Sequence, residues 1–150
     1  MTITTVDEIK TPRKRCQRGR ELELRIERVF DQLNCVLPGI IAIRIEVRQA
    51  RVRGRLIYCK RQPFDYLVMG RGQTWCFDAK ECCTSKWYPG HAPPHQLEAL
   101  RKAQGIGKRA AWLIWFRGTD NPTTELRWVE DLETPATVNS GVSFDWEMFL

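Results

Sequence analysis

The chain has 150 residues and a formal net charge of +6, and 43% of its residues are hydrophobic. This length suits one domain with its own core, and the composition is that of a folded rather than a disordered protein. No apolar run is long enough to cross a membrane, and the start has no secretory apolar segment. We therefore expect a cytoplasmic protein without a membrane partner.

The positive charge is concentrated in the first half of the chain. Between Lys10 and Arg61 cationic residues outnumber acidic ones several-fold, whereas the segment after Arg117 is acidic. Arginine predominates over lysine in the basic half, and its planar guanidinium can bind two phosphate oxygens at once. This pattern indicates a polyanion such as DNA as the partner.

The first predicted helix follows a polar start. Residues 1–17 are polar and basic, and Pro12 argues against an early helix, so we expect a flexible basic segment ahead of a single domain over residues 18–150. From Leu22 to Leu33 apolar residues recur at helical spacing and predict a helix ending near Asn34. Glu23 lies at the margin of the apolar stripe, next to whatever the helix packs on.

Two β-rich segments come next. The β-branched run from Ile40 to Val47 predicts a strand. Arginines then alternate at Arg51, Arg53 and Arg55 around a glycine. That alternation fits an edge strand guarded by charge or an arm that lies along a phosphate backbone, and we favour the arm.

The second half predicts the rest of a mixed sheet. A loop from Cys82 to Pro94 leads into a helix that Gly105 closes. Residues 110–116 and 126–129 predict a central strand and a short further strand, within a core of 18–130 and a tail of 131–150. The order predicts an α/β fold with a mixed central β-sheet flanked by helices.

The cysteines raise the question of a structural zinc site. There are six, and without an export signal we expect them to be reduced. Cys82 and Cys83 are adjacent and precede His91 and His95, which is not the spacing of a zinc knuckle. We assign the two histidines to loop and helix-start roles.

The strongest functional signal is a pair of aspartates. Asp65 and Asp78 flank two β-rich runs joined by a glycine-containing tetrapeptide, which predicts a hairpin. If Arg71-Gly72 forms the tip, Asp65 lies directly opposite Asp78, with Cβ atoms about 5 Å apart. Two carboxylates at that distance repel by roughly 3 kcal/mol, so a cation between them is expected.

Lys80 projects from the same face as Asp78 by strand periodicity. Two acids and an ammonium together predict a site for Mg²⁺ and a phosphodiester, with the Ala79 carbonyl as a further oxygen ligand and Glu23 completing the acidic cluster. A different register would offset the aspartates. In the alternative interpretation Asp65 and Lys80 form an edge-strand salt bridge and Asp78 is solvated.

The order of these motifs resembles that of the PD-(D/E)xK nuclease superfamily. The residues that carry the resemblance are Gly19 to Glu23, the isolated Asp65, Asp78-Ala79-Lys80, and His95-Gln96 before an apolar helix and a Trp/Phe-rich strand. Within the superfamily the chain is similar to Holliday-junction resolvases of the archaeal Hjc and bacterial RecU kinds. The similarity covers residues 18 to 117.

This resemblance implies a restriction-endonuclease-like fold and a homodimer that resolves four-way DNA junctions by paired nicks, with Mg²⁺ or Mn²⁺ as cofactor. It implies Glu23, Asp65, Asp78 and Lys80 as catalytic residues, with Gln96 as a secondary candidate. Residues expected to contact DNA are Arg18, Arg20, Arg51, Arg53, Arg55 and Lys86. The small size would suit a virus-encoded enzyme that acts in the host cytoplasm.

The chain departs from the superfamily pattern at two positions. Pro63 is separated from Asp65 by Phe64, and Asp78 stands where glutamate is common among related enzymes. Two alternatives stay open at this point. One is a restriction-like or repair nuclease that acts on linear or flap DNA, and the other is a non-catalytic DNA-binding protein.

Overall fold

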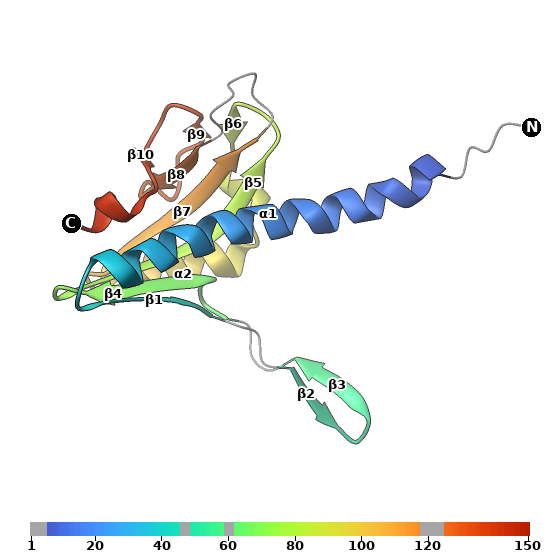
Figure 1. Cartoon of the computed structure of the whole chain (residues 1–150), viewed down its shortest axis with the longest axis horizontal. Coiled ribbons are helices and arrows are strands. Elements are labelled where there is room, and N and C mark those ends of the chain that lie inside the picture. Colours follow the sequence, from blue (N-terminus) through green and yellow to red (C-terminus); the bar gives the residue numbers. More distant parts are fainter. Residues whose placement is uncertain (1–5, 46–48, 59–61, 118–124) are drawn as a thin grey trace, which may run out of the picture.

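The computed structural model describes residues 6–45, 49–58, 62–117 and 125–150 (Figure 1). Its helices are α1 (Val6–Val36) and α2 (Pro94–Gly105), with short 3₁₀ turns at Pro89–His91 and Trp146–Phe149. The strands are β1 (Ile40–Arg44), β2 (Gln49–Val52), β3 (Arg55–Tyr58), β4 (Tyr66–Gly70), β5 (Gln73–Cys82), β6 (Lys86–Trp87), β7 (Arg109–Phe116), β8 (Leu126–Val129), β9 (Ala136–Thr137) and β10 (Val142–Ser143).

Within the described residues, the central sheet has six strands in the order β1-β4-β5-β7-β8-β10. The pair β5–β7 is parallel and the other neighbouring pairs are antiparallel. A parallel pair requires a crossover connection, and α2 lies in it. Figure 1 shows α1 crossing the front of the sheet and α2 behind it. The mixed α/β class predicted from the sequence is confirmed.

Helix α1 covers one face of the sheet through the apolar stripe that the sequence predicted. Leu22, Ile26 and Leu33 are buried in a core that includes Phe77 and Trp128. The helix begins at Val6 and runs through Pro12, so the prediction that Pro12 prevents an early helix is wrong. Proline removes one backbone hydrogen bond, and the helix continues on both sides of it. The division at residue 18 stays a prediction.

Helix α2 covers the opposite face of the sheet. Leu100 and Ala103 are buried in a second core that includes Trp112. The predicted Gly105 stop is wrong, because Gly105 is still helical and Gly107 has the positive φ of 83°. Backbone amides of Gly107 and Lys108 donate to the carbonyls of residues 104 and 103, so the end is a Schellman motif built on Gly107.

The β4–β5 hairpin has the register that the sequence predicted. Tyr66 pairs with Phe77 and Gly70 with Gln73. The turn residues Arg71 and Gly72 have φ values of 53° and 73°, as a two-residue type I′ turn requires. Asp65, one position beyond Tyr66, therefore lies opposite Asp78.

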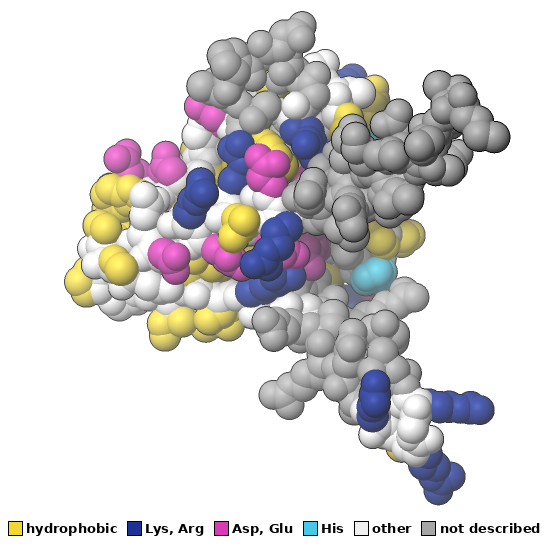
Figure 2. Space-filling model, turned by 45° about the vertical axis from the view of Figure 1, so that its right-hand side comes forward, with side chains coloured by type: hydrophobic (Ala, Val, Ile, Leu, Met, Phe, Trp, Pro, Cys, Tyr) yellow, Lys and Arg dark blue, Asp and Glu magenta, His cyan; other side chains and the backbone are white. Residues whose placement is uncertain are grey.

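The alternating arginines form a separate two-stranded hairpin, β2–β3. Its turn at Arg53-Gly54 also has two positive φ values. Arg51, Arg53 and Arg55 are exposed, and the hairpin lies apart from the central sheet (Figure 1). In Figure 2 dark blue side chains gather at its end. We call residues 49–58 the arginine arm.

The aromatic end of the chain packs on the body of the same domain. Phe144 and Phe149 are buried in the α1-side core, and their rings contact those of Phe77 and Trp75, respectively. No helix in the described part of the chain is long and apolar enough to span a membrane.

Candidate metal centre

Asp65 and Asp78 meet at the end of the β4–β5 hairpin. The Asp65 backbone amide donates to Asp78 Oδ1 over 3.1 Å, and the Ala79 amide donates to Asp65 Oδ2 over 3.3 Å. Each carboxylate thus accepts a backbone hydrogen bond from the other aspartate's strand region. The two acidic side chains are held next to each other by these main-chain hydrogen bonds.

Asp78 is the buried member of the pair, with 1% of its surface exposed. Its Oδ2 is buried and has no hydrogen-bond partner among the described residues. Burial and then the charge of Asp65 raise the pKa of Asp78 to about 7, while Lys80 acts in the opposite direction. An anionic oxygen in this position needs a proton or a cation to offset its charge.

Lys80 extends from β5 on the same side as Asp78. Its Nζ donates to Gln96 Oε1 at 2.5 Å and lies 5.8 Å from the centre of the Trp112 ring. Gln96 belongs to the first turn of α2, so the crossover helix fixes the lysine. Gln96, which the motif resemblance implies as a secondary candidate, thus contacts Lys80, and its role stays a prediction.

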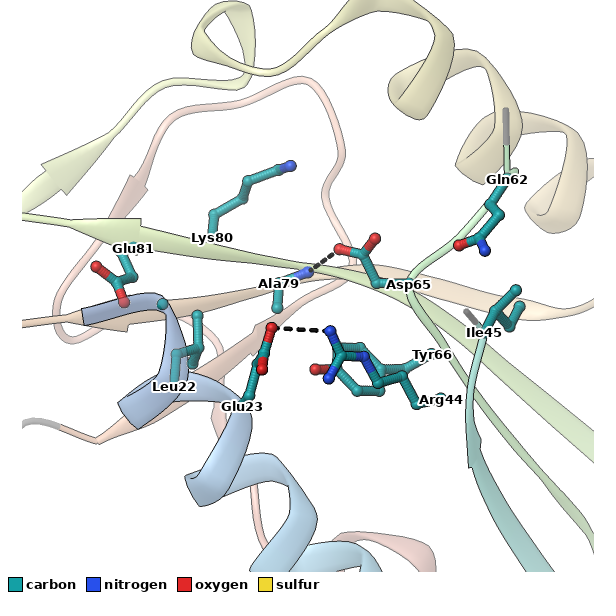
Figure 3. A pocket seen from close by; sticks show the side chains of 11 residues that line it. Leu22, Glu23, Arg44, Ile45, Gln62, Asp65, Tyr66, Ala79, Lys80 and Glu81 are labelled. Carbon is teal, nitrogen blue, oxygen red and sulfur yellow. Dashed lines mark hydrogen bonds and ion pairs between the residues drawn. The ribbon is translucent and has the colours of Figure 1, made fainter. Parts of the chain in front are cut away.

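A cavity of about 630 Å³ opens beside Asp65, Ala79 and Lys80. Glu23, from α1, lines the same cavity (Figure 3), but its Oε1 accepts a hydrogen bond from Arg44 Nη2 at 2.8 Å. The carboxylate of Glu23 is thus bound by Arg44, while Asp65 is bound by the Ala79 amide. Among the described residues no three His, Cys, Asp or Glu side chains form a group that could hold a metal ion.

The cavity also contains residues that the sequence analysis missed, namely Arg44, Gln62, Tyr66 and Glu81. Ile40, Ala42 and Arg44 are alternate residues of β1, so their side chains lie on the same face of the strand, towards α1. This alternation is the sequence signal that could have predicted Arg44 as a cavity residue. Its partner Glu23 is 21 residues away, and no local pattern predicts that pair. Glu81 forms an ion pair with Arg117 at 3.6 Å.

The donor set fits a hard divalent cation. Asp65 and Asp78 present carboxylate oxygens, the ligands that Mg²⁺ and Mn²⁺ prefer, and the unpartnered Asp78 Oδ2 is such an oxygen. Ala79 lines the cavity, and its amide contacts Asp65. A ligand role for the Ala79 carbonyl, and one for Glu23, stay predictions.

The residues predicted to contact DNA are spread over several elements. Arg20 is exposed on α1, the side chain of Arg18 lies outside the described residues, and Arg51, Arg53 and Arg55 are on the arginine arm. Lys86, on β6, is exposed with its Nζ 5.3 Å from the Tyr88 ring centre. The structure therefore does not collect these cations around the aspartates.

The two histidines belong to the connection between β6 and α2. His91 lies in the 3₁₀ turn with its ring 5.5 Å from that of Tyr88, and His95 lies in the first turn of α2. The buried thiol of Cys82 contacts the carbonyl oxygens of Thr84 and Lys86. These positions agree with loop and helix-start roles for the histidines.

Comparisons with known proteins give distant structural similarity only. The chain matches no protein-family model and no curated protein. Among solved structures it is similar to Hjc of Archaeoglobus fulgidus, a Holliday junction resolvase from an archaeal hyperthermophile, with 16% sequence identity and a TM-score of 0.47. The similarity covers 75% of this chain and 71% of that one. A likeness at this level does not assign the chain to a family.

The raised pKa of Asp78 predicts a pH-dependent contribution to stability. In the absence of divalent cations the folded state keeps a proton on this carboxyl up to about pH 7, whereas the unfolded chain releases it near 3.8. The contribution is therefore complete below about pH 4 and is lost as the pH rises through 7, with a total on the order of 4 kcal/mol. The measurement is urea unfolding with a chelator at about pH 5.5 and about pH 8.

The matched control is Asp78→Asn, which should remove this part of the pH dependence. Mg²⁺ added to the wild-type protein at the higher pH should recover much of the lost stability, because the cation replaces the proton. Equal pH dependence in the wild-type protein and the variant would contradict the raised pKa.

Proposed function

We propose that this chain is a divalent-cation-dependent endonuclease with a restriction-endonuclease-like fold that cleaves four-way DNA junctions. The observation that supports it most is the aspartate pair: Asp65 lines the cavity, and the buried Asp78 next to it has an Oδ2 without a hydrogen-bond partner among the described residues. Lys80 adds an ammonium to the same site. Hydrolysis of a phosphodiester develops negative charge on the phosphoryl oxygens, and such a site supplies positive charge to offset it.

The roles of the residues follow from their positions. Asp65 and Asp78 would hold Mg²⁺ or Mn²⁺, which when bound offsets charge on the phosphate and lowers the pKa of a coordinated water. Gln96 fixes Lys80 at 2.5 Å, so the ammonium can donate to a phosphate oxygen or orient the attacking water without first losing side-chain freedom. The Ala79 amide holds the Asp65 carboxylate in place.

DNA as the substrate is supported by charge and by the arginine arm. The chain carries a net charge of +6, and the arm presents Arg51, Arg53 and Arg55 to solvent. Guanidinium groups on a narrow two-stranded hairpin can follow a phosphate backbone. The arm would then contribute affinity, while the aspartate pair would carry out the chemistry.

Selectivity for junctions, and a homodimer that makes paired nicks, are proposed from the motif order of Gly19 to Glu23, Asp65 and Asp78-x-Lys80. A four-way junction has approximate two-fold symmetry. Two copies of the chain related by a two-fold axis would place two sites on matching strands, which is the physical reason for a dimer.

The decisive experiment is a nicking assay on a labelled, fixed four-way junction with and without Mg²⁺. A linear duplex and a flap of the same sequence serve as the matched substrates. Symmetric nicks in the junction alone support the proposal. Equal cleavage of the duplex or flap would identify a restriction-like or repair nuclease, and binding without any Mg²⁺-dependent cleavage would identify a DNA-binding protein.

The double variant Arg51→Ala/Arg53→Ala tests the arm. Both side chains are exposed, so the fold should be unaffected. If they contact phosphates, affinity for DNA should fall and the slope of log K against log salt should flatten by about 2, because about two fewer counterions are released. Binding titrations at several salt concentrations measure this, with Arg101→Ala/Lys102→Ala on α2 as the charge-matched control. An unchanged slope would remove the arm from the DNA interface.

A further inference from the structure

Arg44 is the cation on the α1 side of the cavity. It ends β1, directly opposite Tyr66 in β4, and its guanidinium reaches across to Glu23 on α1 at 2.8 Å. Figure 3 shows this pair on the opposite side of Ala79 from Lys80. The two cations of the cavity wall therefore approach it from the two faces of the sheet, each held by its own partner.

The surroundings of Tyr66 show how closely these charges are grouped. Burial raises the pKa of the Tyr66 hydroxyl to about 12, and the charges of Arg44, Glu23 and Asp65 all act on it as well. Arg44 thus shares one cavity with the acid of α1, Glu23, and the acid of the hairpin, Asp65. A metal ion that used Glu23 as a ligand together with Asp65 would have to occupy this region.

The Glu23–Arg44 pair is not explained by stability. Both side chains are partly exposed, at 31% and 41%, and such pairs contribute little to folding. Counting the charges of the residues around the cavity indicates a role for the pair in metal binding. Glu81 is balanced by Arg117, and the charge of Glu23 is balanced by Arg44.

After these two pairs, the charged residues left at the site are Asp65 and Lys80, which line the cavity, and Asp78, which is buried next to Asp65. One divalent cation neutralises the two aspartates, and Lys80 then matches the single charge of a phosphodiester. A second divalent cation would leave the site with two excess positive charges, and removing Arg44 would reduce this excess to one. The charges of this cavity therefore balance with one metal ion.

We propose that Arg44 takes the place of a second metal ion beside Glu23, so that the site binds one divalent cation and the guanidinium, held by Glu23, positions the phosphodiester. This inference rests on the proposed nuclease function. It departs from the sequence-based expectation that Glu23 is a metal ligand. Arg44 becomes a substrate-positioning residue, and Glu23 holds it.

The test is Mn²⁺ stoichiometry on the DNA-free protein, measured by calorimetry and by the electron paramagnetic resonance signal of free Mn²⁺. The wild-type protein should bind one ion. Arg44→Met removes the charge and keeps much of the side-chain length, so Glu23 becomes available and a second, weaker ion should bind. The double variant Arg44→Met/Glu23→Gln should return to one ion.

Two further variants distinguish a change in metal stoichiometry from a folding defect. Glu23→Gln should still bind one Mn²⁺ within about two-fold of wild-type affinity, because Glu23 is not a ligand. Arg44→Lys keeps the charge and should also bind one ion. In the nicking assay Arg44→Met should lose about 10²-fold, with part of the loss recovered at high Mn²⁺.

Two stoichiometric ions on a wild-type protein that nicks DNA would overturn this inference alone. So would a stoichiometry of one in a folded Arg44→Met variant, or loss of Mn²⁺ binding in Glu23→Gln. A wild-type protein that binds no Mn²⁺ and does not nick DNA overturns the proposed function, and the assignment of Arg44 with it.

Discussion

Replacing Asp78 with asparagine is expected to reduce Mg²⁺-dependent nicking by about 10³-fold or more while junction binding stays within about two-fold. The amide cannot supply the anionic oxygen that a divalent cation needs, and the neighbouring Asp65 alone offers too few ligands. Binding should persist because the cations assigned to DNA contact lie on other elements, chiefly the arginine arm.

The same substitution should stabilise the fold at neutral pH and above. Asp78 is buried against a second carboxylate, and removing its charge relieves a repulsion of roughly 3 kcal/mol, which the cost of burying an amide partly offsets. Thermal unfolding with a chelator at about pH 8 should therefore give a higher Tm for the variant than for the wild-type protein.

The control for this pair of measurements is Asp31→Asn, on the exposed side of α1. It removes the same charge without touching the cavity and should change neither nicking nor Tm. Nicking that survives in Asp78→Asn would remove the aspartate pair from the catalytic site. A fall in Tm would instead mean that the carboxylate of Asp78 stabilises the fold.

Lys80→Met should lose about 10²-fold to 10³-fold in nicking, with little change in DNA affinity. The variant removes the ammonium that Gln96 holds at 2.5 Å and leaves the apolar part of the side chain against Trp112. It also removes the charge that lowers the pKa of Asp78. The residual activity should therefore shift to higher pH, because the aspartate pair must lose its proton before a cation binds.

This shift separates a chemical role of Lys80 from a purely structural one. The measurement is the pH profile of nicking together with Mn²⁺ affinity at about pH 7 and about pH 8.5, where the variant should recover affinity at the higher pH. Lys102→Met on the exposed face of α2 is the matched control and should behave as the wild-type protein. An unshifted profile in Lys80→Met would mean that the ammonium does not act on the aspartates.

The parts of the site that the sequence could predict are those set by local geometry. A turn of two residues with positive φ fixes the register of β4 and β5, and the period of a strand then places Asp78 and Lys80 on one face. The Asp65–Asp78 contact therefore follows from residues 65–80 alone. Gln96 was identified through the motif resemblance, and the docking of α2 behind β5 accounts for its position.

The parts that could not be predicted depend on contacts between distant segments. The Glu23–Arg44 pair joins α1 to β1 and requires the packing of the helix on the sheet. The length of α1 and the use of Gly107 as the helix stop were mispredicted, because a helix tolerates one proline and because Gly105 and Gly107 are equivalent as sequence signals. The packing of Phe144 and Phe149 depends on which part of the sheet the two helices leave uncovered, and this is known only once the helices are placed.

The two hairpins differ in how freely their lengths can vary. One residue inserted between Arg71 and Gly72 would shift the pairing of β4 and β5 by one position and turn every later side chain of β5 to the other face of the sheet. Asp78 would then face α1. The arginine arm has no such restriction, because β2 and β3 pair only with each other among the described strands. We expect variants with longer or shorter arms to differ in their DNA binding, while the Asp65–Asp78 pair keeps its geometry.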